Sequence, residues 1–470
     1  MIIPEERVDI TQIERYIYRV VCEIGRQMFR EYLEQYDAEL MRSRDHEKYR
    51  NKGKKQTTLK TVMGEVVYER ALYRFTDENG VTAGVYLLDE AVGESVSGQI
   101  SPLLAEKIAE TVCEMSYRKT AEAVSAMTGQ TISHGGVWNV IQALGERADK
   151  QEKEDARLNK LHQGRGKREV KLLFEEQDGV WLNLQGRDRK RLGSSAEMKV
   201  AIAYDGAKQT GKGRFNLANK VACANFEGID SFVERKEGVI ASCYNVDEVE
   251  QRVVNGDGAN WVRRSVTDET VCFQLDPYHR NKAVLEHVSN PDARKLIFKL
   301  LYSKQIDTMF DVIDAYANST GDEREAAHYR VLETYFKNNR DGLVSYKRRG
   351  LELPAPPDGL AYRGCGAMES NVFSLIGRRM KRRRANWSIN GGNNMARMLT
   401  LKSTDRLRRA LSVFSLMWLP EKYARPVAVN VLSAAKCPQR VGKGYNGFRH
   451  AAIPVGLPFM KEIFSPMPLV

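Results

Sequence analysis

Three acidic residues in separate segments place the strongest limits on what this chain can fold into. Each of them stands where a predicted buried strand or helix begins or ends. Asp178 follows the apolar run VKLLF, Asp257 follows QRVV, and Glu369 begins a predicted helix that is basic further along. Glycine follows both aspartates, which leaves room for an ion and a phosphate, although a single Asp-Gly pair is more often a tight turn. Two Asp and one Glu from separate elements suit two Mg²⁺ ions about 3.5–4 Å apart, the arrangement that cuts and rejoins phosphodiesters.

The chain beyond residue 166 predicts an RNase H-like α/β core. Apolar strand-like runs appear there, followed by a helix near 229–240 and then by alternating strands and helices; the runs are VKLLFEEQD, GVWLNLQG, EMKVAIAYDG, KVACANFEG, QRVVNGD and CFQLD. Three strands followed by this alternation is the RNase H-like order, in which the strand ends that carry Asp178 and Asp257 are neighbours. The charged helical stretch 289–360 is then a helical insertion in the core.

The 470 residues suffice for several domains, and the core is predicted to follow an α+β N-terminal DNA-binding region with a helix-turn-helix. The charged stretch 147–169 is predicted to be a domain boundary. The predicted segments are an N-terminal helical region (1–48), a basic β-hairpin region (49–100), a helix-turn-helix region (101–165), the first part of the core (166–288), the insertion (289–360), the second part of the core with the Glu-bearing helix (361–424) and a basic C-terminal tail (425–470).

Residues 101–146 predict the helix-turn-helix. Two helices at about 102–114 and 117–127 precede the break TGQT, and Ser133 is a suitable N-cap for a third helix. The first residues of the last helix in such a unit face the major groove of DNA. Plain helical bundles give the same pattern, so both interpretations stay open. The predicted DNA-facing residues are Ser133, His134, Gly135 and Asn139.

Positive charge favours a polyanionic partner. The formal net charge is +12, with 42% hydrophobic and 29% charged residues, and Lys and Arg gain affinity by displacing counterions from phosphates. A dense basic run lies directly behind Glu369, where it can hold a DNA backbone or simply form a solvated face. Trp387, just after that run, is suited to stacking on a distorted DNA end or to the core. The candidate DNA contacts in the run are Arg378, Arg379, Lys381, Arg382, Arg383 and Arg384.

Three further residues accompany the acids. Strand alternation places Glu176 on the same face as Asp178, as an auxiliary ligand or a solvated charge. Asp276, with His279 three residues later, can support the site, cap the next helix or bind nothing.

Other features of the sequence limit the cellular compartment and the class of enzyme. Seven scattered cysteines without a CxxC pair indicate a reducing compartment. The sequence lacks an 18-residue apolar run and a visible signal peptide, so we expect a cytoplasmic, nucleoid-associated protein with no membrane partner. It also lacks the GxxxxGK[ST], GxSxG and HExxH motifs.

The order of segments resembles the ISLre-type insertion-sequence transposases of bacteria over nearly the whole chain. The resemblance is carried by TLKTVMGEVVYERALY, YLLDE, MSYRKTAEAVSAMTGQTIS, EEQDG, NGDGANW, LDPYHRNK and AMESNVFSLIGRRMKRRRANWS. That family is distantly similar to Mutator-like transposases, which have an RNase H-like core with a helical insertion. Asp276 stands where Mutator-like enzymes usually have Cys, a departure that leaves its role open.

The resemblance implies a transposase in which Asp178, Asp257 and Glu369 form a DDE triad that holds Mg²⁺, with Mn²⁺ as a substitute. Its partners would be the double-stranded DNA of element ends and targets, together with further copies of the same chain. An RNase H-like repair or junction nuclease and a noncatalytic helix-turn-helix regulator are the alternatives.

Overall fold

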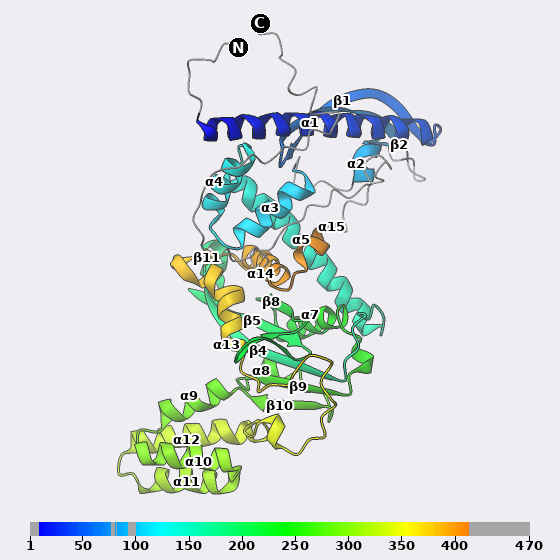
Figure 1. Ribbon diagram of the computed structural model, residues 1–470. Helices are drawn as coiled ribbons and strands as arrows, with labels where there is room; N and C mark the ends of the chain where they lie inside the picture. The colour runs from blue at the N-terminus through cyan, green and yellow to red at the C-terminus, as the bar shows by residue number, and fades with distance from the viewer. Residues whose placement is uncertain (1–8, 77–79, 81, 93–99, 413–470) are drawn as a thin grey trace, which may run out of the picture. The chain divides into compact units, whose positions relative to one another are not determined.

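The computed structural model describes residues 9–76, 80, 82–92 and 100–412 (Figure 1). The tail predicted at 425–470 lies outside the described residues, as does the side chain of Arg383. None of the helices within the described ranges is long and apolar enough to cross a membrane.

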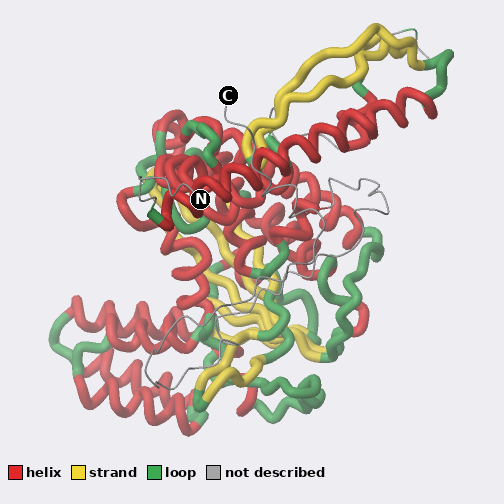
Figure 2. The backbone as a smooth tube through the Cα atoms, turned by 45° about the horizontal axis from the view of Figure 1, so that its top comes forward, coloured by secondary structure: helices red, strands yellow, loops and turns green. Residues whose placement is uncertain are grey.

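The N-terminal part combines one long helix with a β-hairpin, as Figure 2 shows. The predicted turn near Met63 is present, and Gly64 allows it by adopting a φ of +123°. The buried carboxylate of Asp37 joins helix to hairpin, because both of its oxygens accept the backbone N–H of Ala71, at 3.1 and 3.2 Å. The elements are α1 (Ile10–Ser43), β1 (Tyr49–Thr61), β2 (Gly64–Thr76), β3 (Thr82–Val85) and α2 (Leu87–Val92).

Three helices follow: α3 (Pro102–Val112), α4 (Tyr117–Thr128) and α5 (His134–Lys160). The predicted cap is present, since the Ser133 hydroxyl accepts the backbone N–H of Gly136 at 3.0 Å. Helix α5 continues without a break to Lys160, so it includes the first part of the charged stretch 147–169 in which a domain boundary was predicted. Some charges of that stretch pair with another helix, as Lys160 does with Glu234, and others pair within α5, as Lys153 does with Asp149.

A mixed sheet lies at the centre, with the strand order β10-β9-β4-β5-β8. β4 pairs antiparallel with β5 and β5 with β8, whereas β4, β9 and β10 run parallel. The architecture is therefore mixed α/β, and its assignment to the RNase H-like class stays a prediction. The strands are β4 (Leu172–Leu184), β5 (Ser195–Tyr204), β8 (Val221–Asn225), β9 (Gln251–Gly256) and β10 (Val271–Leu275).

β4 is one strand of 13 residues, where the sequence suggested two runs. It pairs with β5 continuously from Phe174 to Asn183, so Asp178 lies inside the strand. The expectation that Asp178 ends a strand is thus wrong. The parallel partner β9, however, pairs only with residues 172–176 of β4, so Asp178 lies just beyond the end of that pairing.

Helices cover both faces of the sheet. One hydrophobic core joins α3, α4 and α5 to the sheet and to α14 (Ile389–Ser403), with Leu104, Val140, Val200 and Met395 among its buried members. The predicted helix-turn-helix region therefore shares a core with the sheet and is not an independent domain. Helix α7 (Ile229–Ala241) contacts both β5 and β8.

The predicted insertion is helical up to residue 338. Its helices share a second core with the sheet, in which Val254 and Phe273 of the sheet meet Ile297, Ile313 and Leu332. Its helices are α10 (Pro291–Ser303), α11 (Ile306–Ser319) and α12 (Glu323–Asn338), followed by single 3₁₀ turns at Arg340–Gly342 and Tyr346–Arg348. Helix α9 (Pro277–His287) precedes the insertion and belongs to the first part of the predicted core.

A buried carboxylate, Glu176, connects the sheet to the segment that precedes α13 (Met368–Val372). One carboxylate oxygen accepts the Tyr204 hydroxyl at 2.6 Å, and the other accepts the Asn255 amide at 3.1 Å. The second oxygen also accepts the backbone N–H groups of Gly366 and Met368, at 2.9 and 3.1 Å. Three strands and a distant loop are thus fastened to one side chain.

A second buried polar cluster fastens α14 to α5 and α7. Arg397 is 3% exposed and lies 2.6 Å from Asp149 and 3.0 Å from Glu152, both on α5. Arg235 of α7 approaches Asp149 to 2.9 Å and Glu227 to 2.7 Å. Each arginine is matched by more than one carboxylate, which offsets the cost of burying the charges.

Replacing Arg397 with Ala should lower the free energy of unfolding by about 3–5 kcal/mol, because Asp149 and Glu152 would lose a buried partner. The matched control is Arg408→Ala, whose exposed ion pair with Glu106 should be worth less than about 1 kcal/mol. Urea denaturation measures both, and equal losses would contradict the central role of the cluster.

Replacing Glu176 with Ala should lower the free energy of unfolding by about 3–5 kcal/mol, because several buried hydrogen-bond donors lose their acceptor. Glu176→Gln should retain the fold, since its amide oxygen can accept the same N–H groups. Burial raises the pKa of Glu176, so the folded protein holds this proton at pH values where the unfolded chain has released it. The resulting stabilisation is complete below the unfolded pKa of about 4.3 and is lost as the pH rises through the folded pKa.

Glu176→Gln cannot titrate, so the stability of wild type relative to this variant should fall as the pH rises from about 4.3. Urea denaturation at several pH values measures the difference. If the stability of wild type relative to Glu176→Gln instead rose with pH, the folded protein would prefer the ionised form of Glu176, which would contradict the prediction.

Candidate acidic site

The parallel pairing of β4 and β9 brings Asp178 and Asp257 close together, just beyond the point where this pairing ends. The last paired residues are Glu176 and Asn255, and two further residues along each strand lead to Asp178 and Asp257. Gly256 permits a close approach, since a Cβ there would lie 3.0 Å from the Gln177 carbonyl oxygen. The predicted proximity of the two aspartates is therefore present, and the charge of Asp178 contributes to raising the pKa of Asp257.

Burial is the main reason that the pKa of Asp257 is raised. The backbone N–H of Ala259, which donates to its carboxylate at 2.9 Å, and the nearby His279 act in the opposite direction. A half-buried carboxylate beside another negative charge is stabilised by an added cation. The position is therefore electrostatically suited to a metal ion.

His279 joins the two aspartates from helix α9. Its Nε2 lies 3.7 Å from Oδ1 of Asp178, and this interaction raises the pKa of His279. Asp276 positions the helix as its N-cap by accepting the backbone N–H groups of Tyr278 and His279, at 2.9 and 3.3 Å. Asp276 also accepts the Asn255 amide at 2.8 Å and is buried. Of the roles open to Asp276, the structure supports the cap.

A further carboxylate, Glu197 on β5, was missed from the sequence. It lies over Gly179, where an added Cβ would come within 2.0 Å of a Glu197 oxygen. Burial raises the pKa of Glu197; Lys199 opposes this, and the charges of Asp257 and Asp178 add to it. The only sequence signal was Gly179, because a glycine leaves room for a neighbouring side chain to lie across it; the cross-strand partner of Gly179 is Lys199, and Glu197 reaches the glycine diagonally.

Glu369 reaches this region on a separate element. It is the second residue of α13, a helix that contacts β4 and β5, and its side chain is exposed. Glu176 holds the backbone just before it through Gly366 and Met368. The expectation that Glu176 is a ligand or a solvated charge is wrong, because its two oxygens are buried and already accept these hydrogen bonds.

The acids do not form a closed metal centre. Among the residues that the structure describes, no three His, Cys, Asp or Glu side chains are grouped so that they could hold one ion. The structure places Asp178 and Asp257 close enough that their charges act on both Glu197 and His279, and it leaves Glu369 on the neighbouring helix. Hard oxygen donors on rigid strands suit Mg²⁺, which usually binds one or two carboxylates and keeps several waters.

The helical insertion contacts the backbone around Asp257 and holds it in place. The Tyr335 hydroxyl of α12 donates to the backbone carbonyl of Asp257 at 2.8 Å. Asn339 packs so tightly on Gly258 that a Cβ there would lie 2.2 Å from its side-chain oxygen, and Gly258 has a φ of +85°. The Asp-Gly pair at this position thus serves a close contact as well as a turn.

The basic run behind Glu369 divides into structural and exposed residues. The helix continues as a π-helical stretch, Phe373–Lys381, and then a 3₁₀ turn, Arg382–Arg384. Arg379 donates to the Val112 carbonyl at 2.7 Å and lies over the rings of Tyr117 and Trp387. Its predicted role as a DNA contact is corrected to a structural one.

The rest of the run differs in exposure. Arg378 pairs with Glu114 of the segment after α3, while Lys381, Arg382 and Arg384 are exposed. Trp387 is buried and donates its indole N–H to the Met380 carbonyl at 2.9 Å, so it belongs to the core and cannot stack on DNA.

The start of α5 has the exposure expected of a recognition helix. His134 and Asn139 are exposed, and Ser133 uses its hydroxyl for the cap. Trp138, which was not predicted as a contact, is 46% exposed between them.

Residues 4–413 match the family described as an uncharacterised protein family, UPF0236. A UPF0236 protein of Caldanaerobacter subterraneus subsp. tengcongensis is 25% identical over 402 residues, covering 83% of this chain and 77% of its own length; its name joins eleven locus designations. Another, from Streptococcus gallolyticus and named for the vanSb 3′ region, is 22% identical over 346 residues, covering 72% of this chain and 71% of its own. Because the family match spans most of the sequence, this chain belongs to the UPF0236 family.

Proposed function

We propose that this protein is a transposase that cuts DNA at the ends of an insertion sequence and joins them to target DNA. The observation that carries the proposal is the register of β4 and β9, which aligns Asp178 and Asp257 just beyond the end of the pairing between these two strands. The strand order supports it, because three antiparallel strands followed by two parallel strands are what an RNase H-like core requires. The ISLre-type resemblance of the sequence agrees with the same class.

Asp178 and Asp257 would be the first ligands of Mg²⁺ or Mn²⁺, and Glu369 from α13 and Glu197 from β5 would be further oxygen donors once the metal and DNA are bound. When bound, the metal supplies a water of lowered pKa and stabilises the leaving 3′-oxygen. His279 orients Asp178 from α9, and Tyr335 holds the backbone of Asp257. Exposed Lys381, Arg382 and Arg384 are suited to neutralising phosphates of a bound duplex.

Joining, as opposed to cutting alone, is supported by a relative. The name of the Caldanaerobacter protein joins eleven locus designations, and repeated copies in one genome are what an element that moves itself would leave. A repair or junction nuclease on the same fold would cut without joining, so a precut 3′-hydroxyl end offered with target DNA separates the two functions.

Replacing Asp257 with Asn should reduce Mg²⁺-dependent cleavage of element-end DNA by roughly 10²-fold or more, because the position would lose a charged ligand. Binding of the same DNA should be unchanged. The control is Asp311→Asn, an exposed aspartate on α11 that should leave both activities intact. Cleavage gels and electrophoretic mobility shifts measure the two properties, and persistent metal-dependent nicking by Asp257→Asn would refute the assignment.

Replacing Lys381, Arg382 and Arg384 together with Ala should weaken duplex binding and reduce the slope of log affinity against log salt by about 2–3, because each contact releases a counterion. Stability should change little, because these side chains are exposed. Arg379→Ala is the contrasting variant: it should destabilise the fold, since its guanidinium packs against Val112 and two rings. Fluorescence anisotropy at several salt concentrations measures the slope, and an unchanged slope would remove this run from the DNA interface.

A further inference from the structure

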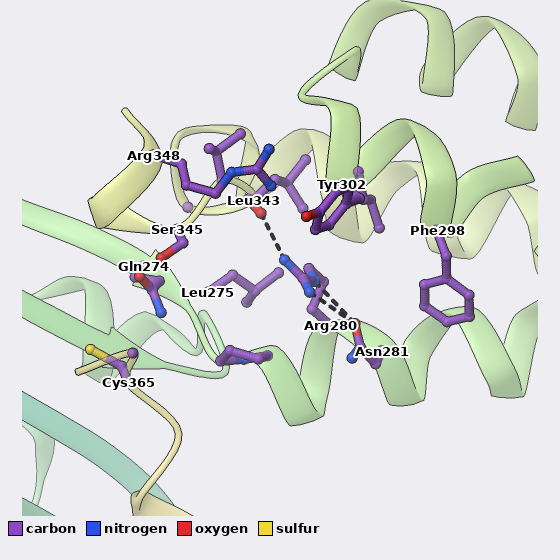
Figure 3. Close-up of a pocket in the computed structure, with 15 residues that line it drawn as sticks. Gln274, Leu275, Arg280, Asn281, Phe298, Tyr302, Leu343, Ser345, Arg348 and Cys365 are labelled. Atoms are coloured by element: carbon purple, nitrogen blue, oxygen red, sulfur yellow. Dashed lines mark hydrogen bonds between the residues drawn. The ribbon is translucent and has the colours of Figure 1, made fainter. Parts of the chain in front are cut away.

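A cavity of about 270 Å³ opens beyond the C-terminal end of β10, between the sheet and the helical insertion (Figure 3). Outside the carboxyl ends of parallel strands is where open α/β sheets usually bind ligands. Its walls come from β10, α9, α10, the turns at 342–348 and the loop before α13. The lining residues used below are Leu275, Arg280, Asn281, Tyr302, Leu343 and Arg348.

The polar part of the wall carries two positive charges among neutral side chains. Arg280 is held in place by the Leu343 carbonyl at 3.0 Å and by the Asn281 side-chain oxygen at 3.1 Å, as Figure 3 shows. Arg348 supplies a second guanidinium. The residues that line this cavity include no carboxylate, and burial lowers the pKa of Arg280. An anion entering here would therefore meet positive charge without competition from a lining acid.

The other part of the wall suits a flat ring. Tyr302 is 78% exposed, and the Arg348 guanidinium lies 4.7 Å from the centre of its ring. Leu275 and Leu343 provide apolar surface beside them. An exposed aromatic ring paired with a guanidinium is the combination on which nucleic-acid bases stack.

Size and position restrict the ligand further. The volume is slightly below the ~300–1,000 Å³ of ordinary small-molecule pockets, so a duplex cannot enter. Arg280 directly follows His279 of the acidic site on α9. Cys365, another lining residue, directly precedes Gly366, which Glu176 holds in front of Glu369. A ligand here would thus contact both segments that present the site's side chains.

We propose that this cavity binds one unpaired nucleotide of a DNA strand, with its phosphate on Arg280 and Arg348 and its base against Tyr302. The proposal rests on the proposed function only in taking the nucleotide from the DNA that is cut. Binding in the cavity holds the strand next to the acidic site and keeps the α9 and α13 segments in place.

The test is calorimetric titration of the full-length protein with dTMP, without divalent metal. Saturable binding is expected, with thymidine and inorganic phosphate each binding at least about tenfold more weakly, because base and phosphate both contribute. Tyr302→Ala and Arg348→Gln should each weaken dTMP about tenfold. Tyr302 is exposed, so its replacement leaves the fold intact, and circular dichroism checks both variants.

The matched controls are Tyr16→Ala and Arg330→Gln, two exposed side chains away from the cavity, which should not change dTMP affinity. Asp257→Asn should also bind dTMP normally, so a failed cleavage assignment would leave this result untouched. No saturable binding up to about 10 mM dTMP would overturn the proposal. So would phosphate that binds as tightly as dTMP, or variants at Tyr302 and Arg348 that bind like wild type.

Discussion

The buried carboxylate of Glu176 is the constraint on which the arrangement of the site depends. It accepts hydrogen bonds from β5 through Tyr204, from β9 through Asn255, and from the backbone at Gly366 and Met368. A carboxylate removed from water is costly unless its oxygens are occupied, and here both are. The same side chain therefore fixes the sheet and presents the segment that carries Glu369, which lies nearly two hundred residues later in the sequence.

Around this anchor, each side chain of the acidic site has an independent support. Asp178 is held by continuous pairing of β4 with β5, and Asp257 by the hydroxyl of Tyr335. His279 depends on the Asp276 cap, which in turn binds Asn255, a residue that Glu176 also holds. Rigid supports of this kind keep ionisable groups close together despite their mutual repulsion. The helical insertion contributes directly, since α12 contacts the backbone of the second aspartate.

The charged residues of α5 have a comparable structural role. Asp149 and Glu152 bind Arg397 of α14, and Arg235 of α7 joins them. The exposed start of the same helix carries His134 and Asn139. One continuous helix thus connects the predicted DNA-facing residues to α7 and α14, the helices that contact β8 of the sheet.

The expected strand order predicted that Asp178 and Asp257 lie close together. The local features could also be predicted from the sequence: the Ser133 cap, the turn at Gly64, and the positions of most helices and strands. These follow from periodicity, turn chemistry and capping, which act over a few residues. It did not reveal that β4 is unbroken, that α5 passes through residue 147, or that Glu197 lies across Gly179. It also misassigned Glu176 and Arg379, whose burial depends on segments far away in the chain. These assignments required the folded chain, because whether a charged side chain is a ligand, a cap or an internal hydrogen-bond acceptor depends on which distant donors and acceptors the fold brings to it.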